Sequence, residues 1–121
     1  MLPNEQLRPE FRAGSLDMDG PWGWRHFDTE HMQEMFHRIF DAQKLTWQTL
    51  REGGSHLVEI SALIPEARKR LDQIAQGVPD SLYSLRVCNR KRIWSIKKAN
   101  VLWLLWWDPN HEVCPSYKKH T

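Results

Sequence analysis

Lysine, arginine and histidine side chains gather toward the C-terminal end of the chain, where they could bind and act on a phosphate group. Residues 82–121 hold eight basic and two acidic residues, a net charge of +6, whereas residues 1–81 hold nine basic and thirteen acidic residues, a net charge of −4. Such an asymmetry indicates a polyanionic partner. The basic residues are Arg86, Arg90, Lys91, Arg92, Lys97, Lys98, Lys118 and Lys119, and His120 follows them.

Two of these residue types suit phosphate chemistry. The arginine guanidinium is a planar fork of N–H donors that matches two phosphate oxygens, and the imidazole of His120 exchanges protons near neutral pH. A plainer interpretation exists for each cluster. Lys118–His120 can be a solvated tail, and Arg90–Arg92 can be a charged hairpin tip that keeps a sheet edge soluble.

Three consecutive strands are expected to position the basic residues. The middle strand alternates between its two faces, and the last is continuously apolar, as is typical of a central strand covered on both faces. The linking residues 88–91 and 97–100 suit hairpins. Asp108–Asn110 ends the third strand, and Glu112–Cys114 is expected to form a short edge strand. The three strands are Leu82–Val87, Arg92–Ile96 and Val101–Trp107.

The first two thirds of the chain predict helices around one further strand. Residues 1–15 have no period and are expected to be a loosely held, flexible arm. Thr29 is expected to cap an amphipathic helix, Thr46 a second helical turn, and Ser61 a helix that ends at Gly77. A strand is expected at His56–Ser61. The first helix carries an apolar stripe, expected to be buried, of Met32, Met35, Phe36, Ile39 and Phe40.

Length and composition predict one domain spanning residues 1–121. The class is α+β, with helices packed on one face of a small, mainly antiparallel sheet. The chain is 40% hydrophobic and 26% charged, and its longest apolar run is too short to cross a bilayer. Cys88 and Cys114 are expected to be reduced thiols of a cytoplasmic protein. The histidines lack a ligand spacing, so neither a metal nor another cofactor is expected.

The second half of the chain, about residues 65–121, resembles the RelE/ParE superfamily of bacterial toxins. The similarity lies in SLRV, a basic hairpin, RIWSI, an apolar strand and a basic tail with a histidine. The RelE- and YoeB-like enzymes that cut messenger RNA on the ribosome are the nearer match. The resemblance implies a RelE-like fold, a cognate antitoxin, and messenger RNA with the ribosome as partners. The segment LWWDPNHEV and the long opening depart from the family pattern, and Thr121 stands where an aromatic residue is expected after the histidine.

By this resemblance, RNA is cleaved without a metal ion through attack of the ribose 2′-hydroxyl. Such a reaction needs a base, an acid and cations around the phosphate. Arg92 stands at the strand start where these toxins place an arginine, and His120 would be the acid, with Lys119 beside it. Asp80 lies near the position of a family glutamate and is the first candidate base; Glu59 and His111 are others. The expected RNA-binding residues are Arg86, Arg90, Lys91, Lys97, Lys98, Tyr117 and Lys118.

Two other functions remain open at the level of the sequence. A ParE-like protein would inhibit a protein target such as DNA gyrase without catalysis, and an RNA-binding protein would use the same basic sheet without cleaving RNA. A third possibility is an interaction protein whose site has decayed. Substitution of His120 would abolish the activity only if the protein is the RNA-cleaving enzyme.

Overall fold

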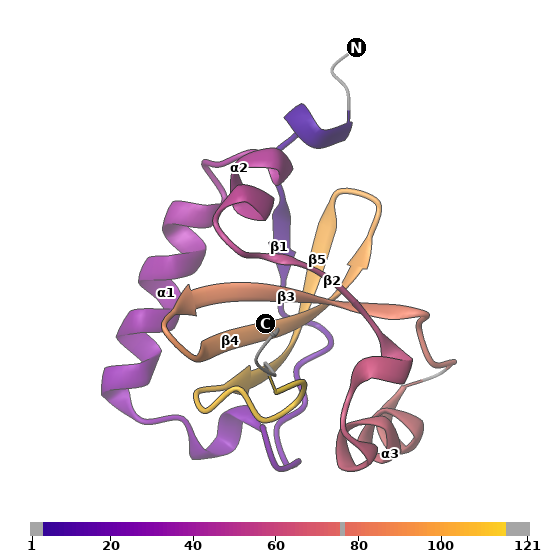
Figure 1. The fold of residues 1–121 in the computed structure, drawn as a ribbon. Helices are drawn as coiled ribbons and strands as arrows, with labels where there is room; N and C mark the ends of the chain where they lie inside the picture. The colour runs from indigo at the N-terminus through magenta and orange to yellow at the C-terminus, as the bar shows by residue number, and fades with distance from the viewer. Residues whose placement is uncertain (1–3, 76, 116–121) are drawn as a thin grey trace.

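The computed structural model describes residues 4–75 and 77–115, which form one mixed sheet with helices packed against it (Figure 1). The sheet has five strands in the order β1-β5-β4-β3-β2. The strands are β1 (Glu10–Arg12), β2 (His56–Glu59), β3 (Ser81–Cys88), β4 (Lys91–Lys98) and β5 (Val101–Asp108). The helices are α1 (Thr29–Ala42), α2 (Trp47–Glu52) and α3 (Pro65–Ile74), with 3-10 turns at Asn4–Gln6, Trp24–His26 and Ile60–Ala62. The α+β class predicted from the sequence is confirmed.

The three C-terminal strands form the predicted antiparallel meander, and two short strands extend it at its edges. β2 pairs with β3 in antiparallel fashion, so that His56 lies opposite Ser84. β1 pairs with β5 in parallel, with Glu10 opposite Val101. The prediction of a loosely held arm is therefore wrong for Glu10–Arg12. The predicted edge strand at Glu112–Cys114 is also wrong, because Val113 and Cys114 lie in a bend, where the Val113 carbonyl accepts the Ile64 N–H at 2.9 Å.

Both hairpins turn through a residue with a left-handed backbone. Asn89 has φ 48° between β3 and β4, and Ala99 has φ 53° between β4 and β5. Asparagine tolerates this conformation well, since its short polar side chain can bond locally, whereas alanine adopts it at a cost. At the β4–β5 turn, the Lys97 ammonium donates to the Ala99 carbonyl at 2.9 Å, which helps to hold the strained residue.

α1 and α2 begin at side-chain caps and α3 does not, and two of the three predicted caps are misplaced. Asp28, not Thr29, caps α1 and accepts the His31 N–H at 2.8 Å. Thr46 caps α2 as predicted. Ser61 lies inside a 3-10 turn, and α3 begins with Pro65 at its first position, which suits a residue without an N–H.

The sheet has a hydrophobic core on each face, so the prediction that helices cover one face only is wrong. α1 and α2 pack on the face that carries Tyr83, Leu85 and Ile93. α3 packs on the opposite face, which carries Leu82 and Trp94. Figure 1 shows α1 and α3 on opposite sides of the strands.

β5 contributes to both cores, which explains its continuous apolar sequence. Leu102, Leu104 and Trp107 belong to the α1 face, and Leu105 and Trp106 belong to the α3 face. The register shifts opposite Trp94 and Ser95, where Leu105 is the extra residue of a β-bulge. Its carbonyl accepts Trp24 Nε1–H at 2.8 Å and the Asp17 N–H at 3.1 Å. The bulge thereby holds the segment before α1 against the sheet.

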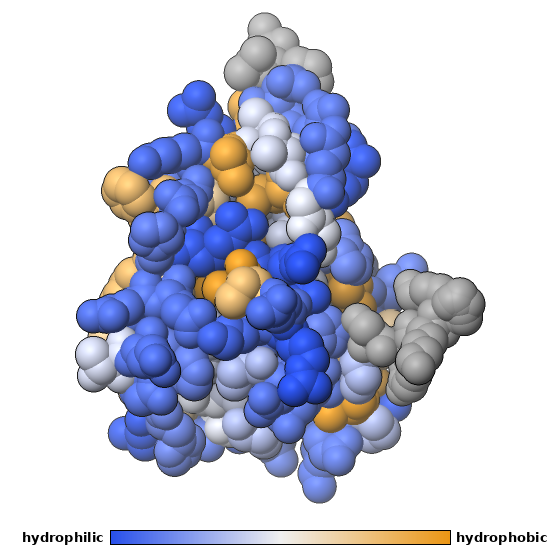
Figure 2. Space-filling view, turned by 60° about the vertical axis from the view of Figure 1, so that its left-hand side comes forward, coloured by the Kyte–Doolittle hydropathy of each residue, from blue (hydrophilic) through white to orange (hydrophobic). Residues whose placement is uncertain are grey.

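The apolar stripe of α1 is mostly exposed, contrary to the prediction of a buried stripe. Met35 is buried and Ile39 is partly buried, but Met32, Phe36 and Phe40 are exposed. Figure 2 brings forward the side of the molecule that carries α1, where apolar side chains interrupt a mostly hydrophilic surface. Part of the hydrophobic face of α1 therefore has no partner within the described residues.

Neighbouring residues on α1 should respond very differently to truncation. Met35 is 7% exposed and Phe36 is 60% exposed. We expect Met35→Ala to lower the free energy of unfolding by about 2–5 kcal/mol, because it leaves a cavity in the core. Phe36→Ala should change it by less than about 0.5 kcal/mol. Urea denaturation of the two variants measures these changes. Equal losses of unfolding free energy in the two variants would show that α1 does not bury Met35 and expose Phe36.

Candidate functional site

Two arginines lie directly opposite each other at the β3–β4 hairpin end of the sheet. Arg86 on β3 pairs with Arg92 on β4, on the face of the sheet that also carries Trp94. The Arg92 guanidinium is half-buried and donates to the carbonyls of Asn89 at 2.6 Å and Lys91 at 3.0 Å. Burial, and then the charge of Arg86, lower the pKa of Arg92. Like charges facing each other across strands destabilise a sheet, so this pair is suited to an anion that neutralises it.

A buried carboxylate beside Arg92 is engaged elsewhere. Asp108 on β5 lies opposite Arg92 in the register, yet no ion pair joins the two among the described residues. The Asp108 oxygens accept Trp94 Nε1–H at 3.1 Å and the N–H groups of Glu112 at 2.8 Å and Val113 at 3.0 Å. Asp108 therefore fixes the turn after β5, and its hydrogen-bonding capacity is largely used there.

That turn brings His111 within range of the charge of Arg92. His111 has φ 58°, a conformation that is uncommon for a residue with a side chain and is often found at functional sites. Burial, and then the charge of Arg92, lower the pKa of His111, while backbone hydrogen bonds and Asp108 act in the opposite direction. The imidazole is therefore predominantly neutral at pH 7 and can accept a proton.

The remaining predicted site residues are dispersed. Lys91 forms an ion pair with Glu34 of α1 at 2.7 Å, and Arg90 is exposed in the turn. Lys97 and Lys98 lie at the other end of β4. Asp80 precedes β3, six residues from Arg86, which is about 20 Å along a strand. The structure therefore does not bring Asp80 to Arg92. Tyr117, Lys118, Lys119 and His120 lie outside the described residues.

A third arginine, which sequence reasoning missed, extends the cationic region around the β3 edge. Arg38 of α1 donates from Nε to the Arg86 carbonyl at 2.8 Å. Burial lowers the pKa of Arg38, and the charge of Arg86 acts in the same direction. Both arginines line a groove of about 380 Å³ with Gly53 and Cys88. The only signal in the sequence was the position of Arg38 off the apolar stripe of α1.

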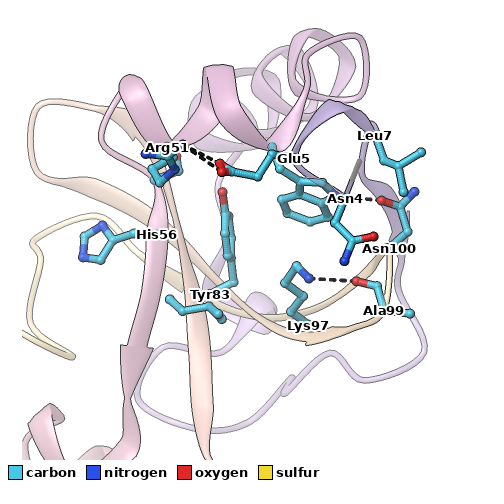
Figure 3. Close-up of a pocket in the computed structure, with 12 residues that line it drawn as sticks. Asn4, Glu5, Leu7, Arg51, His56, Tyr83, Lys97, Ala99 and Asn100 are labelled. Atoms are coloured by element: carbon cyan, nitrogen blue, oxygen red, sulfur yellow. Dashed lines mark hydrogen bonds and ion pairs between the residues drawn. The ribbon is translucent and has the colours of Figure 1, made fainter. Parts of the chain in front are cut away.

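A second candidate site is a cleft of about 600 Å³ that does not include Arg86 or Arg92 in its lining (Figure 3). It lies between the 3-10 turn Asn4–Gln6, α2, β2 and the β4–β5 hairpin. Tyr83 of β3 also lines it. The sequence did not indicate the cleft, because its walls come from five separate segments. The lining residues are Asn4, Glu5, Leu7, Trp47, Arg51, Ser55, His56, Leu57, Tyr83, Lys97, Ala99 and Asn100.

Residues 4–75 and 77–115 contain no group of three or more histidine, cysteine or acidic side chains placed to hold a metal ion. No helix within these ranges has the length and apolar character needed to span a membrane.

Comparisons of the chain with protein-family models, with curated proteins and with solved structures found no match.

Proposed function

We propose that the protein is a RelE-like toxin that binds RNA on the Arg86–Arg92 pair and cleaves it, with the ribosome presenting the message in the cytoplasm. The observation that carries the proposal is the placement of these two arginines opposite each other. The charge of Arg92 also acts on the imidazole of His111. Arginine forks bind phosphate oxygens in pairs, and a phosphodiester would relieve the repulsion between the two guanidinium groups.

The proposed reaction needs one proton acceptor and one proton donor. The ribose 2′-oxygen attacks the phosphorus, its proton passes to a base, and the bond from phosphorus to the 5′-oxygen breaks. His111 is the proposed base: burial and the charge of Arg92 lower its pKa, so the imidazole is unprotonated and able to take up the proton near neutral pH. His120, with Lys119, is kept as the acid that protonates the leaving 5′-oxygen. Arg86 and Arg92 stabilise the charge that grows on the phosphate oxygens.

Asp80 does not fit this arrangement as the base. It lies at the far end of β3 from Arg86, and a candidate base must reach the 2′-hydroxyl of the nucleotide held by the arginines. The proposal therefore replaces Asp80 with His111 in that role.

Cleavage of messages by purified ribosomes tests the proposal. We expect Arg92→Ala to reduce the rate of cleavage by about 100-fold, as removal of one preorganised transition-state donor does. His111→Ala and His120→Ala should each reduce it by about 100-fold or more. In a bacterial host the wild type should arrest growth, and the three variants should not.

Matched variants separate chemistry from folding. Arg25→Ala removes an exposed arginine paired with Asp19, and His37→Ala removes an exposed histidine of α1; both should cleave like the wild type. All variants should retain a cooperative thermal transition. If folded Arg92→Ala cleaves at the wild-type rate, or the wild type leaves messages intact, the enzyme assignment is wrong.

The exposed side chains of α1 favour a second candidate, a ParE-like protein that acts by binding another protein. Met32, Phe36 and Phe40 offer an apolar surface for such a partner. The same surface would suit the antitoxin of the first proposal. Under the second candidate, growth arrest would come with DNA damage instead of cut messages. Phe36→Ser with Phe40→Ser would abolish it, whereas His111→Ala would not.

A further inference from the structure

We propose that the cleft beside β2 is a binding site for a small aromatic molecule that carries one carboxylate or sulfonate group. This inference is separate from the RNA-binding proposal, because the cleft contains neither Arg86 nor Arg92 and, of the expected RNA-binding residues, only Lys97. Three observations support this proposal. The cleft has a suitable size and fixed apolar walls, it contains one ammonium group, and the other charges that line it compensate each other.

The walls of the cleft are largely apolar and already in place. A volume of about 600 Å³ is within the usual range for small-molecule sites. Trp47 and Tyr83 meet edge to face with ring centroids 5.3 Å apart. The Trp47 N–H donates to the Leu7 carbonyl at 3.0 Å, and its indole Nε1–H donates to Asn100 at 2.7 Å. Three separate segments are thus held in position, so binding requires little reorganisation.

The ammonium group of Lys97 is available to an anion. Lys97 Nζ donates to the Ala99 carbonyl at 2.9 Å and lies 4.7 Å from the centroid of the Trp47 ring. No carboxylate of the described residues forms an ion pair with it. An ammonium has three N–H donors. Figure 3 shows the Lys97 amine directed into the space that the lining residues surround.

The other charges that line the cleft compensate each other. Glu5 and Arg51 form an ion pair on the side facing Lys97 (Figure 3). With Lys97, the lining carries a formal charge of +1. Burial raises the pKa of Tyr83 to about 12, so its hydroxyl stays protonated and can donate a hydrogen bond. A flat apolar molecule with a single negative group matches this combination.

Titration of the full chain with 8-anilinonaphthalene-1-sulfonate is the direct test. We expect saturable binding at one site in the folded protein, displaced by 2-naphthoate. Lys97→Met should weaken binding of the sulfonate by about tenfold, because it removes the cation and keeps the length of the side chain. Lys98→Met, which removes the exposed neighbouring lysine, should leave binding unchanged.

A neutral probe completes the experiment. 2-Naphthalenemethanol should bind Lys97→Met as well as it binds the wild type. Equal weakening of both probes would mean that the variant distorts the cleft, and a cooperative unfolding transition is required of each variant. Unchanged sulfonate binding in folded Lys97→Met, or binding that never saturates, would overturn the proposal. A peptide that displaces the probe while 2-naphthoate does not would assign the cleft to a protein segment instead.

Discussion

Arg70→Ala is expected to lower the free energy of unfolding by about 3–5 kcal/mol, because it leaves a buried carboxylate without its counter-charge. The Asp17 side chain is 2% exposed, and Arg70 donates to it from Nε at 2.9 Å and from Nη2 at 2.7 Å. Trp106 Nε1–H is a third side-chain donor at 2.8 Å. These bonds join α3 and β5 to the segment before α1. Urea denaturation measures the loss.

An exposed arginine provides the control for this prediction. Arg51 forms an ion pair with Glu5, but both side chains are more than half exposed. Exposed pairs contribute little, so Arg51→Ala should cost less than about 1 kcal/mol. Similar losses in Arg70→Ala and Arg51→Ala would show that the Asp17–Arg70 pair is not buried in solution.

The Asp17 carboxylate should also make the free energy of unfolding depend on pH in the acidic range. Burial alone would raise the pKa of Asp17, but hydrogen bonds from Arg70 and Trp106 outweigh it and hold the pKa below the ordinary value of 3.8. A carboxyl with a depressed folded-state pKa stabilises the protein above its unfolded-state pKa. This stabilisation is lost as the pH falls below 3.8 toward the folded-state value. Asp17→Asn should flatten that part of the profile of unfolding free energy against pH.

Asp108→Ala is expected to cost about 3–5 kcal/mol and to disturb the candidate site. The side chain is fully buried, and its removal leaves three donors without their acceptor: Trp94 Nε1–H and the N–H groups of Glu112 and Val113. Each unsatisfied buried donor costs about 1–3 kcal/mol. The turn that carries His111 loses its anchor, so RNA cleavage should fall together with stability if the proposed function holds.

Two measurements separate these effects. Urea denaturation gives the loss of stability, and hydrogen exchange at the Val113 amide reports opening of the turn. Asp72→Ala, at an exposed position of α3, should change neither quantity. Unaltered exchange at Val113 in Asp108→Ala would show that the carboxylate does not hold the turn.

Much of the sheet could be predicted from the sequence because strand period and turn residues are local properties. Val101–Trp107 was expected to be covered on both faces, and the two core clusters confirm it. The pairing of β1 could not be foreseen, since three residues without a clear period join a strand about ninety positions later. The exposure of Phe36 could not be predicted either. Hydrophobic periodicity shows which residues share a helix face, but it does not show whether the rest of the protein covers that face.

The candidate site was predictable only in part. Arg86 and Arg92 were recognised by their charge, and the hairpin register places them opposite each other. The turn at Asp108–Asn110 was expected and His111 was among the candidate bases, but the sequence did not show that the Asp108 carboxylate would anchor the turn through Glu112 and Val113. Asp80 lies far from Arg92 because β3 carries the chain away from Asp80. Its place near a family motif in the sequence did not show how far apart the two residues lie in space.

The parallel pairing of β1 with β5 has a consequence for biosynthesis. β1 is translated first of the five strands and β5 last, and β5 lies between β1 and β4 in the sheet. The nascent chain therefore cannot complete its sheet until β5 has left the ribosome, and loop closure over this distance slows folding. The finished fold, with any activity it supports, therefore depends on a pairing that closes a loop of about ninety residues.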